Sequence, residues 1–156
     1  MEDDLKRIRA IADYQLGPGC GETLFPEGVT LGYSRNTGRI RHVYLGDVLL
    51  ASLKPKDGFF TLSIAGAERL VSDSGEFRFT VMVDDEAADF IARGRSVFAK
   101  HVNAVGEDVR PGCEVVVINP LRRVLAVGRA TLNNEEMLAF KVGVAVKVRH
   151  GNRERS

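Results

Sequence analysis

The chain has 156 residues, of which 44% are hydrophobic, and a formal net charge of +1. This composition is typical of one globular domain or two small ones, and it excludes disorder as the general state of the chain. With 22 basic and 21 acidic residues, no global field attracts nucleic acid or membrane, so any such affinity must come from local patches.

Neither a long apolar run nor a secretory leader pattern is present, so we expect a soluble, cytoplasmic protein without membrane contact. Cys20 and Cys113 form no CxxC pair and are too far apart for a zinc motif. We expect two reduced thiols, with a disulfide as the alternative. The three histidines show no metal-binding spacing, so the sequence predicts no metal site and no cofactor.

An amphipathic helix is predicted over residues 3–14, where apolar side chains recur at helical spacing behind two aspartates. The helix should stop before LGPGCG, where glycines and a proline predict no regular structure. TLGYS and RIRHVYL then predict a hairpin around the turn residues RNTG. Strict alternation would place Ile40, His42 and Tyr44 on one face of the second strand.

VLLASL and FFTLSI predict two further strands, and AGAERLV predicts a short helix after them. The polar stretch SDSGE, residues 72–76, shows no periodicity and is the best candidate for a domain boundary. We therefore expect two domains, residues 1–74 and residues 75–156. The first is predicted to be a small α+β domain with an antiparallel sheet.

The second half begins with FRFTVMV, which alternates as a strand does. Asp84, Asp85 and Glu86 then indicate a helix start and Gly94 its stop, with Ala88, Phe90 and Ile91 available for the buried face. An alternative interpretation is that these carboxylates are paired catalytic acids, which would require a substrate site. Their position at a helix N-terminus accounts for them without one, because negative charge is favourable at the positive end of the helix dipole.

Three strands and one short helix are predicted after this helix and the strand SVFAKHV. VVVI (residues 115–118), LAVGRATL and GVAVKVRHG predict the strands, and Asn133 or Asn134 would cap the helix NEEMLAF. Many short strands with few helices, joined by glycine and proline turns, indicate a small closed or half-closed barrel.

Four blocks of the second half together resemble the PUA domain, an RNA-binding module shared by pseudouridine synthases and archaeosine transglycosylases. The blocks, in the order and spacing of that domain, are RGRSVFAKHV, VRPGCEVVVIN, LAVGRA and GVAVKVRHG. The first half is similar to the small domain that precedes the PUA domain in archaeal tRNA-guanine transglycosylases, in DYQLGPGCGETLFP, SRNTGRIRHVYL and LKPKDGFFTLSIAGAERL. The resemblance implies an α+β fold in which the N-terminal domain is followed by a PUA-like β pseudo-barrel with short helices.

The catalytic part of the transglycosylase family is a separate barrel domain with aspartate nucleophiles and a cysteine-rich zinc site. Such a barrel needs about 200 residues, and this sequence has neither the length nor the cysteines for it. We therefore expect no catalytic residue and no enzymatic activity. The part of these enzymes that this chain resembles is their C-terminal end, which binds the acceptor-stem side of tRNA. The resemblance therefore implies RNA binding without base chemistry.

Basic residues bracket the apolar core of the first and last PUA-like blocks. In a PUA-like fold the helix stop at Gly94 and the strand after it flank a groove, with the final strand nearby. Cations there would meet phosphates, and backbone amides of residues 96–99 would face bases or ribose hydroxyls. Alternation would place Lys147 and Arg149 on one face. The predicted RNA-binding residues are Arg93, Gly94, Arg95, Ser96, Val97, Phe98, Ala99, Lys100, His101, Lys147, Arg149 and His150.

These charges have a second interpretation, because basic residues at strand ends also deter aggregation between sheet edges. Another basic group lies on the predicted hairpin. It either extends the RNA surface or is a solvated hairpin face, and it consists of Arg35, Arg39, Arg41 and His42.

The leading hypothesis is a non-catalytic RNA-binding protein for tRNA or another structured RNA with an accessible single-stranded end. The alternative is an accessory RNA-binding subunit of a separately encoded archaeosine-type tRNA-guanine transglycosylase. Binding should depend strongly on salt. Lys147→Glu combined with Arg149→Glu is predicted to leave the fold intact and to weaken RNA binding about tenfold or more.

Overall fold

The computed structural model describes residues 2–72 and 77–153. The chain forms two compact units, Met1–Phe77 and Arg78–Ser156. The predicted boundary between residues 74 and 75 lies outside the described residues. Within the described ranges, no helix is long and apolar enough to cross a membrane.

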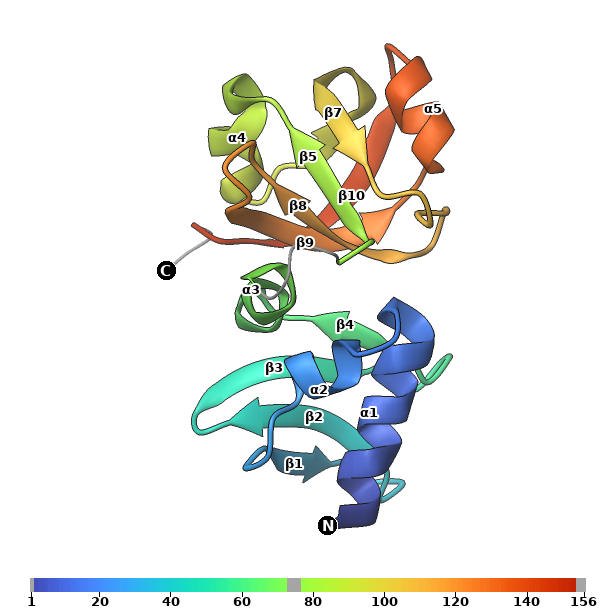
Figure 1. The fold of residues 1–156 in the computed structure, drawn as a ribbon, viewed down its shortest axis with the longest axis vertical. Helices are drawn as coiled ribbons and strands as arrows, with labels where there is room; N and C mark the ends of the chain where they lie inside the picture. Colours follow the sequence, from blue (N-terminus) through green and yellow to red (C-terminus); the bar gives the residue numbers. More distant parts are fainter. Residues whose placement is uncertain (1, 73–76, 154–156) are drawn as a thin grey trace. The chain divides into compact units, whose positions relative to one another are not determined.

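The first unit begins with helix α1 (Glu2–Leu16), which runs across the strands of the sheet beside it (Figure 1). Its acidic first turn suits the positive end of the helix dipole, and its buried residues Ile8, Ala12 and Leu16 recur at helical spacing. The predicted helix is therefore confirmed and is slightly longer at both ends.

A second helix, α2 (Cys20–Leu24), follows directly, so the prediction of no regular structure throughout LGPGCG is wrong at its end. The reason lies in Gly21, because a Cβ atom there would come within 2.3 Å of the carbonyl oxygen of Arg9. The glycine lets α2 pack closely against α1, and its N–H donates a 2.7 Å hydrogen bond to the Asp13 carboxylate. Here glycine serves close packing as well as chain reversal.

Four antiparallel strands form a sheet in the order β1-β2-β3-β4 and confirm the predicted meander. Helix α3 (Ile64–Ser72) follows them and packs on β3 and β4. The bounds of the strands are β1 Thr30–Tyr33, β2 Ile40–Leu45, β3 Val48–Leu53 and β4 Phe60–Leu62.

Strict alternation along β2 is wrong, because the sheet contains bulges. Pairing with β1 runs from His42 directly to Ile40 and leaves Arg41 without a partner residue. Ile40 and Val43, which alternation would place on opposite faces, are consequently both buried. A bulge reverses which face the following side chains occupy.

The second unit contains a six-stranded sheet in the order β6-β10-β9-β8-β5-β7. All neighbours are antiparallel except β5 and β8, which are parallel. The outermost strands, β6 and β7, are joined by only one turn of 3-10 helix, η1 (Ala99–His101), which brings the two ends of the sheet together. The bounds are β5 Thr80–Val83, β6 Val97–Phe98, β7 Val102–Val105, β8 Glu114–Ile118, β9 Val124–Ala130 and β10 Val144–Gly151.

The predicted fold class is thus confirmed, as a small α+β unit and a nearly closed β barrel. SVFAKHV, however, is not one strand, since η1 interrupts it and redirects the chain from β6 into β7. A buried alanine at the turn, Ala99, marks the place where the chain bends over the core.

Two helices pack on this sheet, α4 (Asp85–Ala92) against β9 and β10 and α5 (Asn134–Ala139) against β7 and η1. Helix α4 is capped by Asp84, whose carboxylate accepts a hydrogen bond from the Ala87 N–H, as the acidic run predicts. Phe90, which the sequence makes available for the buried face, is instead 58% exposed, and the buried residues of this helix are Ala87, Ile91 and Ala92. Helix α5 has a capping box between Asn133 and Glu136.

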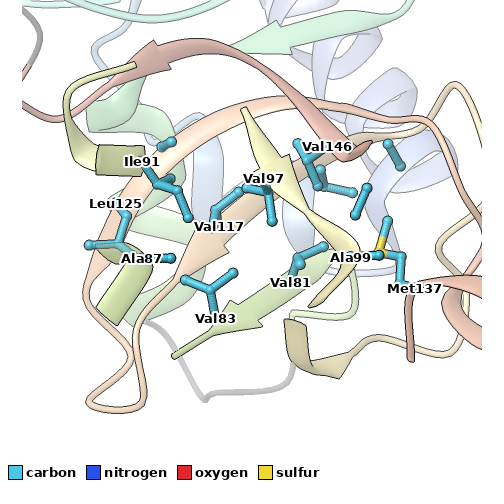
Figure 2. Close-up of a cluster of buried hydrophobic side chains, with 14 of the residues drawn as sticks. Val81, Val83, Ala87, Ile91, Val97, Ala99, Val117, Leu125, Met137 and Val146 are labelled. Atoms are coloured by element: carbon cyan, nitrogen blue, oxygen red, sulfur yellow. The ribbon is translucent and has the colours of Figure 1, made fainter. Parts of the chain in front are cut away.

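The core of the second unit is built from small branched side chains. Val81 and Val83 of β5 meet Val117 of β8 and Val146 of β10, and Ile91 of α4 packs on the same cluster (Figure 2). Valine and alanine fill the narrow interior of a small barrel without strain.

Candidate nucleic-acid interface

The structure places the first and last PUA-like blocks side by side. Phe98 of β6 lies opposite Val144 of β10, and Val97 lies opposite Val146. The N–H of Ala99 donates a 2.9 Å hydrogen bond to the carbonyl oxygen of Gly143, which extends the contact beyond the strands. The two stretches singled out by their basic residues are thus neighbours in the fold.

The apolar residues between the charges close the barrel. Val97, Ala99 and Val146 are buried in the core (Figure 2). Two predicted RNA-binding residues, Val97 and Ala99, therefore have no side chain to offer a ligand. The N–H of Ala99 is also occupied by Gly143, so the prediction that this amide faces RNA is wrong.

The outer face of β6 and β10 carries both apolar and cationic side chains. Phe98 and its partner Val144 are 48% and 37% exposed. Lys147 is exposed on the same strand and pairs with Arg129 of β9, which is also exposed. Directly opposite residues share a face of the sheet. The Phe98 ring and the charged groups of Lys147 and Arg129 therefore all project outward.

Sequence analysis missed an apolar extension of this face. Leu138 in α5 is exposed, and Phe140 and Val142 in the connection to β10 are exposed as well. Lys141 lies between them and is also exposed. A helix of six residues cannot bury all the apolar side chains of MLAFKVGV, and that excess was the available signal.

Arg149 differs from its predicted role. Pairing of β10 with β9 runs from Val148 directly to His150, so Arg149 occupies a bulge. Its guanidinium forms a bidentate ion pair with the Glu114 carboxylate. Nη1 donates to Oε1 at 3.0 Å, and Nη2 donates to Oε2. The Glu114 side chain is only 5% exposed. Arg149 thus neutralises a buried carboxylate, and replacing it by glutamate would not leave the fold intact.

Two other predicted cations also have internal partners. His101 Nδ1 lies 3.2 Å from the carboxylate of Asp84, the residue that caps α4. Arg93 forms a 3.0 Å ion pair with Asp89, which also pairs with Arg153. Both side chains thus contact residues of α4 or of its cap.

Arg95, Lys100 and Lys147 are the predicted cations that remain available. All three are exposed, and none forms an ion pair with another residue in the ranges 2–72 and 77–153. Of the other predicted residues, Ser96 is half-buried beside β6 and His150 is exposed on β10.

The backbone conformation at position 94 favours a glycine. Its φ of 105° lies in the left-handed region that favours glycine at a helix C-terminus. Gly151, at the end of β10, approaches so closely that a Cβ there would be 2.6 Å from the Gly94 nitrogen. The end of α4 and the end of β10 are held together at this point. Among the described residues, no cluster of three or more histidine, cysteine or acidic side chains could hold a metal ion.

Comparison with protein families divides the chain in the same way. Residues 6–75 match the patch-forming domain C2 of tRNA-guanine transglycosylase, and residues 79–151 match the PUA domain. The tRNA-guanine(15) transglycosylase of Methanothermobacter thermautotrophicus is 42% identical over 149 residues, 96% of this chain. That of Thermococcus kodakarensis is 42% identical over 146 residues, 94% of this chain.

The chain spans about a quarter of the length of these curated relatives, 23% and 25%, and matches their C-terminal part. Two solved structures share the fold across both units. A hypothetical protein of Pyrococcus horikoshii superposes with a TM-score of 0.78 at 21% identity and covers 99% of this chain and 93% of its own. A conserved PUA domain protein from Thermoplasma acidophilum gives 0.69 at 19% identity, covering 98% and 91%.

Both matched domains occur in the order in which the archaeal relatives carry them, and together they account for nearly every described residue. The chain therefore carries, in this order, a domain that matches the patch-forming domain C2 of tRNA-guanine transglycosylase and a domain that matches the PUA domain.

Proposed function

We propose that the protein binds RNA, with tRNA as the principal ligand, on the outer face of β6 and β10, and that its role is binding and not base chemistry. The observation that carries this proposal is the pairing of Phe98 with Val144 beside the exposed cations Lys100 and Lys147. Aromatic rings stack on unpaired bases, and lysines neutralise phosphates. A tRNA ligand would place the protein in the cytoplasm.

Lys100→Glu combined with Lys147→Glu is expected to weaken tRNA binding about tenfold or more and to lower the salt slope of log Kd by about two. Neither lysine forms an ion pair within residues 2–72 and 77–153, so the thermal unfolding temperature should change little. Fluorescence anisotropy with labelled tRNA at several salt concentrations measures both quantities.

The matched control is Lys6→Glu combined with Arg123→Glu, which changes the net charge equally at exposed positions outside β6 and β10. This control should retain the slope and nearly all of the affinity. Equal losses in the two double variants would mean that net charge alone governs binding, and the proposed face would be wrong.

A second candidate function is that of an RNA-binding subunit for a transglycosylase whose catalytic chain is encoded separately. The observation that favours it is 42% identity, across 96% of this chain, to part of a tRNA-guanine(15) transglycosylase. Affinity purification from native lysate should then recover a catalytic chain, and deletion of the gene should remove the modified base from tRNA. Unaltered tRNA modification in the deletion strain would contradict this role.

A further inference from the structure

The four-stranded sheet of the first unit ends in two edge strands, β1 and β4 (Figure 1). The β4 edge is covered by Gln15 of α1, whose side chain accepts a hydrogen bond from the Phe60 N–H at 2.7 Å and donates one to the Phe60 carbonyl at 2.9 Å. The backbone of β1 pairs with β2, and no group of any other described residue bonds to it. One edge of β1 is therefore open to a further strand.

The open edge of β1 presents the backbone groups of alternate residues. The Ser34 N–H donates to the Arg39 carbonyl at 2.7 Å, on the side of β2. Successive residues of a strand turn their N–H and C=O groups to opposite edges. The groups of Leu31 and Tyr33 therefore face outward, where they are available to pair with an added strand.

A cavity of about 270 Å³ adjoins this edge. Leu31 lies opposite Val43 of β2, which is buried, so the Leu31 side chain lies on the core-facing side of the sheet. On that side the first turn of α1 and the loop before β1 complete the cavity, which is lined by Glu2, Leu5, Glu27, Gly28, Val29 and Leu31.

Tyr33 joins the strand to the first turn of α1. Its hydroxyl donates a 2.9 Å hydrogen bond to the Asp4 carboxylate. That bond is the main reason why the pKa of Tyr33 is raised above its ordinary value. The walls of the cavity thus belong to elements that are already bonded to one another, and the cavity is preformed.

The cavity combines apolar walls with a negatively charged rim. Val29 is buried, and Leu5 and Leu31 are half-buried. Glu2 and Glu27 are exposed, and neither forms an ion pair with another described residue. A lysine or arginine side chain has the matching chemistry, because its methylene stem packs on apolar surface while its charged end stays at a polar rim.

We propose that the β1 edge site, which consists of β1 and this cavity, binds an extended basic segment of a partner protein. The segment adds to the sheet beside β1, and main-chain hydrogen bonds to Leu31 and Tyr33 hold it there. A residue opposite Leu31 shares the face of the sheet on which Leu31 lies, so its side chain reaches the cavity. A lysine or arginine at that position is bound between Glu2 and Glu27.

The charges of the β1 edge site select this occupant over two others. RNA would bring its phosphates against the carboxylates of Glu2 and Glu27. A second copy of this chain, paired through β1 of both copies, would bring the same carboxylates of each copy together, and Thr30–Tyr33 offers no cation to neutralise them. A basic segment of another protein meets neither obstacle.

The test is an amide NMR titration of the full chain with a blocked five-residue peptide, acetyl-TVKVT-amide. We expect the largest shifts at the amides of Leu31 and Tyr33 and at the residues that line the cavity. Replacing the lysine of the peptide by glutamate should weaken binding about tenfold or more, because like charges then meet. Methylating the backbone nitrogen of that lysine should also weaken binding, because the nitrogen then donates no hydrogen bond to β1.

Glu2→Gln combined with Glu27→Gln keeps the shape of the cavity and removes its charge, so the affinity for the peptide should fall about fivefold. The matched control is Glu68→Gln combined with Glu107→Gln, which removes two exposed carboxylates elsewhere and should retain the affinity. Thermal unfolding establishes that both variants fold.

Three results would overturn the proposal. The first is equal binding of the lysine and glutamate peptides, or equal affinity of the two double variants for the lysine peptide. The second is butylamine that binds as tightly as the peptide, which would show an amine site without strand pairing. The third is a concentration-dependent shift at Leu31 and Tyr33 in the chain alone, which would identify a second copy as the occupant.

Discussion

Arg149→Ala should lower the free energy of unfolding by about 3 kcal/mol, because it leaves the buried Glu114 carboxylate without its guanidinium. Removing one member of a buried pair costs far more than removing an exposed one, since the remaining charge stays desolvated. Urea unfolding followed by circular dichroism measures the difference.

Two controls separate this effect from the loss of any cation on β10. Lys147→Ala, at the exposed position two residues earlier, should change the stability by less than about 0.5 kcal/mol. Glu114→Leu combined with Arg149→Met should recover most of the loss, because no charge is then buried. A cost below about 1 kcal/mol for Arg149→Ala would show that the pair behaves as a surface ion pair.

Gly151→Ala is the second substitution for which we expect a large effect, again about 3 kcal/mol. The new Cβ would lie 2.3 Å from the Ala92 carbonyl oxygen and 2.6 Å from the Gly94 nitrogen. Both are backbone atoms already engaged in hydrogen bonds, with Arg153 and with Ile91, so neither can move without breaking one. The substitution should part β10 from the end of α4.

Gly143→Ala is the matched control at the other end of β10. Gly143 has a φ of 97°, and a Cβ there meets no atom within 4 Å, so this substitution costs only backbone strain of about 1–2 kcal/mol. The thermal unfolding temperature of Gly151→Ala should therefore fall well below that of Gly143→Ala. Similar temperatures would mean that the close approach at Gly151 relaxes easily.

The sequence predicts those features of the fold that depend on local pattern. The periodicity of α1, the cap at Asp84 and the hairpin turns each leave a signature within a few residues, and each is confirmed. The bulges at Arg41 and Arg149 leave none, because the partner strand determines which residue is skipped. Alternation therefore predicts the wrong face for the side chains around them.

The same distinction between local and long-range features applies to the candidate interface. Resemblance to the PUA domain predicts that β6 and β10 approach one another, and they do. It does not distinguish cations that are free to bind a ligand from those with internal partners. Arg149 is bound by a glutamate 35 positions earlier in the chain, and His101 by Asp84. Such pairs form only through the tertiary fold, so the sequence alone treats Arg149 and Lys147 as equivalent.

The pairing of β6 with β10 has a consequence for synthesis. Phe98 and Val144 stand 46 positions apart (144 less 98), and β10 must enter between β6 and β9. Strands so distant along the chain pair late in folding. On the ribosome, β6 has no neighbouring strand in this sheet until β10, which ends at residue 151, has been translated. A nascent fragment without β10 thus lacks the face of β6 and β10 on which we propose that RNA binds.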